Sequence, residues 1–212
     1  MWESKQYDLE LGHDLLDRKW RKLFCSDIKT EKTKHWHFGV DCRTFSMAAH
    51  NNQVRDKAWP LGKPDLNDVK KNLAETGNQM VDLTVDCCIQ ILDWCARNNY
   101  PLDRITFSIE NPVRSHLWSH PKMLMLLNRP GVQRINLCYC RYGRGFRKGT
   151  YFVTNCQKMD GIALWCNHPE GHSTVLMGTD TAKLGNPYPK RLCTKIATIL
   201  TNHHVANGNV WR

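Results

Sequence analysis

The chain has 212 residues, of which 41% are hydrophobic, and its 30 Lys and Arg against 20 Asp and Glu give a formal charge of +10. This size and apolar content exclude a wholly disordered chain and predict a single domain over residues 1–212. The positive charge favours a polyanionic partner, nucleic acid before an anionic membrane surface. No apolar run approaches the roughly 20 residues that span a bilayer, so we expect no membrane partner.

The ten cysteines could form a disulfide framework, but their context favours free thiols. The first ten residues are charged and polar, unlike a secretory signal peptide. A chain of this length also does not depend on disulfides to stabilise its core. We therefore expect reduced cysteines and an intracellular location, nuclear or cytoplasmic, rather than secretion.

Hydrophobic periodicity predicts alternating helices and strands. In chain order, helices are expected at 17–26, 78–98 and 190–200, and strands at 35–40, 104–109, 133–140 and 150–154. The segment 51–64 contains two prolines and is expected to be a loop. Such alternation is typical of an α/β sheet flanked by helices, with ligands bound at the ends of the strands.

Residues 40–46 put Cys42 in a turn directly after the first predicted strand, where catalytic nucleophiles are often found. A thiolate there needs a lowered pKa or a nearby positive charge, which the adjacent Arg43 could supply. The simpler alternative, favoured when this motif is taken alone, is a buried core cysteine.

Glu110 follows an apolar predicted strand, and Asn111 and Pro112 then turn the chain. A carboxylate at the end of such a strand is costly unless it is paired or functional. Glu110 is therefore a candidate ligand-binding residue at the edge of the sheet. The alternative is a carboxylate that only caps the loop.

The segment 141–152 interleaves cations with aromatic residues and three glycines. Its cations are Arg141, Arg144, Arg147 and Lys148. Positive and aromatic side chains on a glycine-rich loop are typical of contacts with the phosphates and bases of nucleic acids. The alternative is a solvated basic hairpin.

A fourth motif lies before the last predicted helix. Gly185 and Asn186 predict a turn, and Pro189 predicts the start of the helix, where proline is favoured. Taken alone, the motif marks only the beginning of a helix.

In this order, the segments resemble motifs of the DNA cytosine-5 methyltransferase family, most closely its divergent members from viruses and mobile elements. The resemblance covers roughly residues 11–200. The matching segments are 12–16, 42–46, 60–64, 110–118, 140–148 and 185–189.

This resemblance implies an incomplete Rossmann-like sheet of the methyltransferase type, DNA as the favoured nucleic acid, and S-adenosylmethionine as cofactor. In the family, a cysteine attacks C6 of a cytosine that has left the helix, a glutamate holds the N3 edge of the base, and C5 takes the methyl group. Carried over to this sequence, the catalytic residues would be Cys42, Glu110 and Arg147. Asp14 and Asn186 would lie in the segments that approach the cofactor.

The sequence departs from the family at the cofactor site and beside the nucleophile. The Phe-x-Gly-x-Gly loop and the acidic residue after the second strand are missing. Asp41 replaces a proline, and its negative charge is expected to raise the pKa of the Cys42 thiol. Two hypotheses follow: a methyltransferase whose cofactor site is completed by a second polypeptide, or an inactive methyltransferase-like fold that binds nucleic acid or a protein partner.

Cys156, Cys166, His168 and His172 suggest a different chemistry, with the pattern Cys-x9-Cys-x-His-x3-His. Two thiolates and two imidazoles suit tetrahedral Zn²⁺. The sequence therefore offers a candidate zinc site in a small Cys/His insertion over residues 155–175. Two core cysteines and two surface histidines are the simpler alternative.

Overall fold

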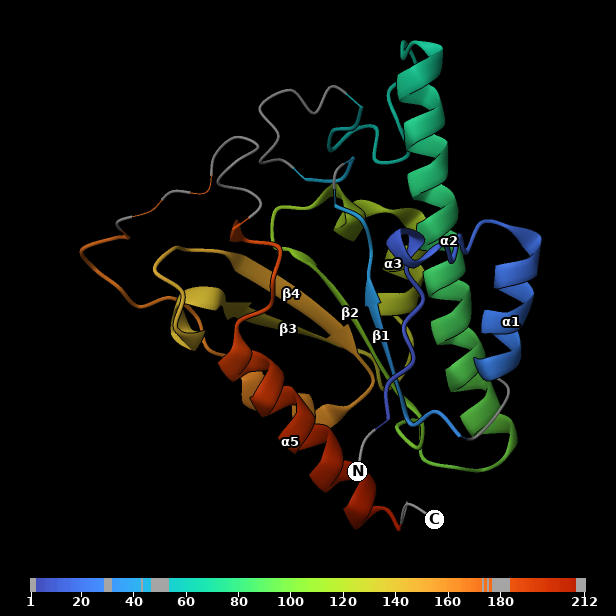
Figure 1. Ribbon diagram of the computed structural model, residues 1–212, viewed down its shortest axis with the longest axis vertical. Helices are drawn as coiled ribbons and strands as arrows, with labels where there is room; N and C mark the ends of the chain where they lie inside the picture. Colours follow the sequence, from blue (N-terminus) through green and yellow to red (C-terminus); the bar gives the residue numbers. More distant parts are fainter. Residues whose placement is uncertain are drawn as a thin grey trace.

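The computed structural model describes residues 3–28, 32–42, 44–46, 54–172, 174, 176 and 184–208. At its centre is a four-stranded mixed sheet in the order β1-β2-β4-β3 (Figure 1). The strands are β1 (His35–Gly39), β2 (Thr106–Pro112), β3 (Gln133–Cys138) and β4 (Gly149–Thr154). β1 and β2 are parallel, whereas β4 is antiparallel to both of its neighbours.

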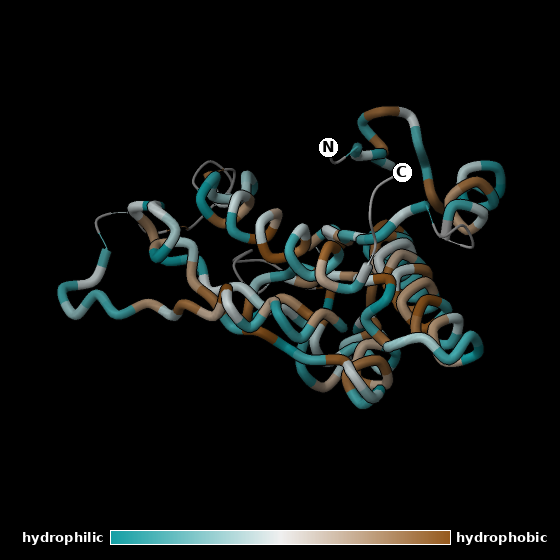
Figure 2. The backbone as a smooth tube through the Cα atoms, turned by 90° about the horizontal axis from the view of Figure 1, so that it is seen from below, coloured by the Kyte–Doolittle hydropathy of each residue, from teal (hydrophilic) through white to brown (hydrophobic). Residues whose placement is uncertain are grey.

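Helices cover both faces of this sheet (Figure 1). The α-helices are α1 (Arg18–Ile28), α2 (Asp68–Arg97), α3 (Pro121–Leu127) and α5 (Lys190–Ala206), and the 3-10 helices are η1 (Leu9–Leu11), η2 (His116–Ser119), η3 (Tyr139–Tyr142) and η4 (Gln157–Ile162). α2 and α3 lie on one face of the sheet and α5 crosses the other (Figure 1). Hydrophobic and hydrophilic residues alternate along their turns (Figure 2), as expected for helices that bury one side. Within the described residues, no helix is both long enough and apolar enough to span a bilayer.

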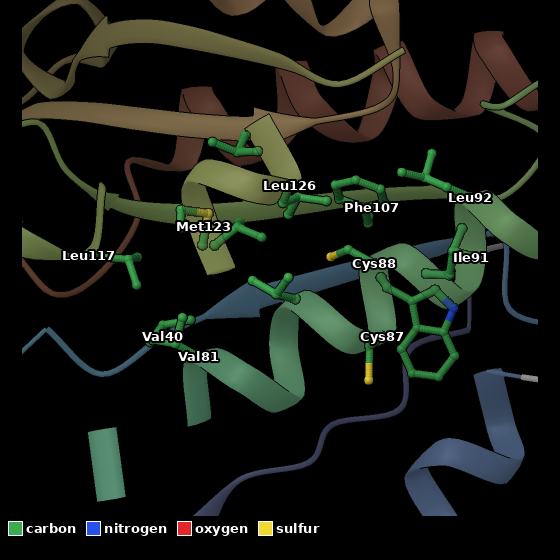
Figure 3. Packing of buried hydrophobic residues seen from close by; sticks show 14 of the residues in the cluster. Val40, Val81, Cys87, Cys88, Ile91, Leu92, Phe107, Leu117, Met123 and Leu126 are labelled. Carbon is green, nitrogen blue, oxygen red and sulfur yellow. The ribbon is translucent and has the colours of Figure 1, made fainter. Parts of the chain in front are cut away.

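The face of the sheet that packs against α2 and α3 is apolar. Trp36 of β1 and Phe107 and Ile109 of β2 are buried in the cluster that these helices complete. Figure 3 shows Phe107 beside Cys88 of α2 and Leu126 of α3. Because side chains alternate along a strand, the residues between these positions point to the opposite face.

On that opposite face, β3 and β4 supply the apolar part. Ile135, Leu137 and Phe152 pack against Leu192 and Leu200 of α5. These contacts hold α5 across the antiparallel half of the sheet. The parallel half, formed by β1 and β2, is polar on this side.

The sequence-based α/β prediction is confirmed, and each predicted strand corresponds to an observed one. α2 begins at Asp68 rather than at residue 78, because Asn67 caps it by accepting a hydrogen bond from the Lys70 amide at 3.0 Å. Its first turns extend beyond the sheet (Figure 1), so the apolar periodicity that marks a packed helix is absent there. The seven-residue helix α3 was not predicted, since it is too short to show a period.

A row of hydrogen-bonded histidine and hydroxyl side chains, called here the file of histidines, lies on the polar side of β1 and β2. His35 Nδ1 is 2.8 Å from Thr106 Oγ1, and its Nε2 is 3.0 Å from Ser108 Oγ. His37 Nδ1 also contacts Ser108 Oγ, at 2.8 Å, and His204 of α5 reaches Thr106 Oγ1 at 3.2 Å. Burial lowers the pKa of His35 to about 3 and that of His204 to about 4. Both rings are therefore neutral at physiological pH.

Replacing His204 by Gln should make the stability of the fold less dependent on pH. In the unfolded chain the histidine side chain has a pKa of about 6.5. Below that pH it binds a proton, whereas His204 in the folded protein stays neutral. The free energy of unfolding should therefore fall as the pH drops from about 6.5 to 4, by up to roughly 1.4 kcal/mol per pH unit for this histidine. Gln can still hydrogen-bond to Thr106 but cannot titrate. The free energy of unfolding of His204→Gln, measured with urea, should therefore not show this part of the decrease with pH. An unchanged slope would contradict the prediction.

Candidate functional site

The candidate site is built around the carboxylate of Glu110, near the end of β2. Glu110 is only 8% exposed, and its side chain lies on the polar side of the sheet. Tyr139 donates a hydrogen bond to Oε1 at 3.4 Å, and Tyr188 donates one to Oε2 at 3.3 Å. Lys148 Nζ is 3.6 Å from Oε1. The buried charge is therefore paired with a cation and hydrogen-bonded, as such a charge requires.

The two tyrosines connect Glu110 to distant parts of the chain. Tyr139 belongs to η3, directly after β3, and Tyr188 lies just before α5. Burial and the nearby Glu110 charge raise the pKa of both phenols, so they stay neutral donors. The Tyr188 hydroxyl is also 2.9 Å from His37 Nε2. Since its single hydrogen goes to Glu110, we infer that His37 carries its proton on Nε2, and the file of histidines thus ends at the carboxylate.

Cys42 lies in a tight turn after β1 and is half-buried. Its carbonyl oxygen accepts hydrogen bonds from the amides of Phe45 and Ser46, at 3.0 and 2.7 Å. The fully buried Phe45 ring packs against the guanidinium of Arg55, whose carbon Cζ is 4.1 Å from the ring centre. Arg55 is itself buried and donates a hydrogen bond to the Ala74 carbonyl of α2, so the turn is fixed to the long helix.

Electrostatics bring Cys42 into the same site as Glu110 and Lys148. Burial raises the pKa of the Cys42 thiol, and the charges of Asp41 and Glu110 raise it further, while Lys148 opposes them. The net effect is a raised pKa, in the direction expected from Asp41 in the sequence. Cys42 is therefore a protonated thiol at neutral pH in the chain by itself.

The cations of the basic loop, residues 141–148, make different contacts. Lys148, and not Arg147, contacts Glu110, and it also donates a hydrogen bond to the Gly185 carbonyl at 3.0 Å. The exposed Arg147 lies over the ring of Trp165, with Cζ 5.5 Å from the ring centre. Arg144 donates to the carbonyl of Pro187 at 3.0 Å. The loop is thus attached to the segment that leads into α5.

The remaining predicted residues lie at the periphery or outside the described structure. Asp14 is exposed, and its carboxylate accepts a hydrogen bond from the Leu16 amide at 2.9 Å. Asn186 is exposed in the segment before α5, and Arg141 is half-exposed in η3. Arg43, which we considered as an activator of the thiol, lies outside the described residues.

A cationic hollow of about 780 Å³ lies beside Tyr188, at the first turns of α5. Its cations are Arg144, Lys190, Arg191 and Lys195. Among the described residues, no side chain caps the N-terminus of α5, which follows Pro189. The free amides and the helix dipole add to the positive potential, so the hollow is suited to bind an anion such as phosphate.

A second group of side chains gathers ligands that a metal could use. Cys140, Cys166, His168 and His172 each offer one ligand atom, and these four atoms all lie within 4.8 Å of one another. Cys166 Sγ is 3.2 Å from His172 Nε2 and 3.6 Å from His168 Nδ1. Hydrogen bonds from the His168 amide and from the two rings lower the pKa of Cys166 to about 6.

This group differs from the predicted zinc site in one ligand, because Cys140 stands where we expected Cys156. Cys156 is fully buried in the apolar cluster beneath α5, and burial raises the pKa of its thiol to about 11. Cys140 belongs to η3, far from the other ligands in sequence. Its only sequence signal was its place beside the basic loop, which says nothing about spatial proximity to the histidines.

Comparison of the chain with protein-family models, with curated proteins and with solved structures gives no match.

The charges around Cys42 predict how fast its thiol is alkylated. Glu110→Gln removes a negative charge that raises the thiol pKa, so iodoacetamide should react faster with Cys42 than in the unaltered protein. Lys148→Met removes the opposing positive charge and should slow the reaction. Mass spectrometry of the Cys42 peptide measures both rates, with the exposed Cys193 as internal reference. Equal rates in all three proteins would show that these charges do not act on the thiol.

Proposed function

We propose that this chain is a methyltransferase-like protein that binds nucleic acid and receives an extruded base beside Glu110. The observation that carries the proposal is the position of Tyr188, which hydrogen-bonds to Glu110 and also lines the cationic hollow at α5. An extruded nucleotide needs polar partners for its base and positive charge for its phosphate. The Glu110 carboxylate and the cationic hollow meet at the Tyr188 side chain.

The chemistry of Glu110 favours cytosine over thymine. A carboxylate accepts a hydrogen bond from the N4 amino group of cytosine, whereas thymine presents an oxygen at that position. Lys148 lies on the same carboxylate and can donate to an oxygen or ring nitrogen of the base. DNA is the nucleic acid we propose, in keeping with the family resemblance.

The sheet is mixed: β1 and β2 form a parallel pair, and β4 lies antiparallel between β2 and β3. The motifs that resemble the family meet at this sheet. Cys42 follows β1, Glu110 lies in β2, and Lys148 directly precedes β4.

Binding to a short DNA duplex should depend on both features. Changing Lys190 and Arg191 together to Gln should weaken binding at every sequence and flatten the log–log dependence on salt by about 0.9 for each phosphate that the variant no longer neutralises. A mismatched base costs less to extrude, so the unaltered protein should prefer a duplex in which one cytosine is mismatched. Glu110→Gln should abolish this preference. Fluorescence anisotropy over a series of salt concentrations measures both effects.

Lys122→Gln is the matched control, since Lys122 pairs with Asp86 of α2 on the other side of the sheet. Its affinity and salt slope should equal those of the unaltered protein. Equal slopes in the control and in the Lys190/Arg191 variant would overturn the phosphate assignment. A mismatch preference that survives Glu110→Gln would overturn the base assignment.

Methyl transfer is the second candidate function, because Cys42 shares the site with Glu110. In that reaction the Cys42 thiolate bonds to C6, C5 is methylated and loses its proton, and the sulfur–carbon bond then breaks. The residues that the resemblance assigns to S-adenosylmethionine, Asp14 and Asn186, are both exposed, and the Phe-x-Gly-x-Gly loop of the family is missing from the sequence. This candidate therefore needs a second polypeptide that completes the cofactor site.

The raised pKa of Cys42 predicts that the chain alone forms no covalent adduct. An oligonucleotide carrying 5-azacytosine should bind at neutral pH and dissociate in denaturant, and Cys42→Ala should bind it with the same affinity. Denaturing electrophoresis detects an adduct, and calorimetric titration detects S-adenosylmethionine. An adduct that requires Cys42, or heat from cofactor binding, would favour the methyltransferase over the binding protein.

A further inference from the structure

We propose that Cys140, Cys166, His168 and His172 bind one zinc ion, and that this ion fastens the basic loop of residues 141–148 to the loop beside it. The site is separate from the buried carboxylate and from the cationic hollow. The zinc site does not depend on whether the chain binds nucleic acid.

The distances between the ligand atoms fit a tetrahedral ion. Zinc bonds of about 2.3 Å to sulfur and about 2.0–2.1 Å to nitrogen place neighbouring ligand atoms roughly 3.3–3.8 Å apart. Cys166 Sγ lies 3.2 Å from His172 Nε2 and 3.6 Å from His168 Nδ1. The whole set, including Cys140, lies within 4.8 Å, so only small shifts separate it from zinc geometry.

The donor set selects the metal. Mg²⁺ and Ca²⁺ prefer oxygen ligands, and this group offers two sulfurs and two imidazole nitrogens. Four protein ligands fill a tetrahedral shell and leave no position open for substrate, which is the pattern of a structural rather than a catalytic zinc site. The ion would therefore contribute to folding, not to a reaction.

Three of the four ligands come from one loop without regular secondary structure. Residues 163–172 contain no helix or strand and project from the body of the molecule (Figure 1). The end of this loop is hydrophilic (Figure 2), so it cannot be fixed by burial of apolar surface. The fourth ligand, Cys140, is only 8% exposed and lies in η3 against the sheet. A metal bond from Cys140 would anchor the projecting loop to the core.

The anchored loop also packs against the basic loop. Phe146 of the basic loop forms a β-bridge with Thr174, and the Leu164 carbonyl accepts a hydrogen bond from the amide of Cys138, at the end of β3, at 2.8 Å. Trp165 fills the space above Gly149, where a Cβ atom would come within 2.8 Å of the ring. The same ring lies under the guanidinium of Arg147, 5.5 Å from its centre. Zinc would thus fix the surface on which the cations of the basic loop are presented.

The test is the metal content of the purified full-length chain. After dialysis against metal-free buffer, mass spectrometry should find roughly one zinc ion per chain, and Co²⁺ substitution should give the thiolate charge-transfer band of a tetrahedral site. His168→Gln and Cys140→Ser should each lose most of the zinc. His168 is exposed, so its substitution leaves the core intact and keeps the result interpretable if Cys140→Ser fails to fold.

Cys193→Ser, which changes an exposed thiol outside the group, should keep its zinc, and so should the Lys190/Arg191 double variant. Removing zinc with a chelator should speed proteolysis within residues 163–174, and adding zinc back should reverse this. Zinc-free protein that takes up no added zinc, or full zinc content in His168→Gln, would overturn the proposal. Loss of zinc in Cys156→Ser but not in Cys140→Ser would assign the site to the ligand set predicted from spacing.

Discussion

The buried charge of Glu110 is the constraint on which the rest of the site depends. A carboxylate taken out of water costs several kcal/mol unless its lone pairs are satisfied, so its partners must be held in place whenever the protein is folded. Those partners are Tyr139, Lys148 and Tyr188, and each comes from a different segment. One charge at the end of β2 therefore fixes the start of η3, the approach to β4 and the approach to α5 together.

Helix α5 spans two unlike surfaces of the sheet. Over β3 and β4 the helix is held by apolar contacts such as those of Leu192 and Leu200. Over β1 and β2 it meets a polar surface, which His204 joins by contacting Thr106. Desolvation keeps the histidines of this surface neutral, so the file leading toward Glu110 adds hydrogen-bonding groups but no second charge. The first turns of α5 are then free to present their cations to a ligand.

The sequence could predict the strands and Glu110 because both depend on local pattern: an apolar run, and a carboxylate at its end. It could not predict which cation of the basic loop meets Glu110, because the choice between Arg147 and Lys148 depends on the pleat. Phe152 pairs with Glu110 across the sheet, and alternate positions share a face, so Lys148 and not Arg147 falls on the side of the carboxylate. The sequence did not point to Cys140 as a candidate metal ligand, because the fold rather than a sequence spacing brings it to the histidines.

The charge state of Cys42 separates a catalytic use of this site from a binding use. Attack on a base requires a thiolate, and here burial, Asp41 and Glu110 all favour the thiol over it, while Lys148 is the side chain that opposes them. A bound nucleic acid would bring further negative charge and move the thiol pKa in the same unfavourable direction. Catalysis would therefore need a positive group or a proton acceptor from outside these residues. Binding needs neither, so the raised pKa of Cys42 does not oppose it.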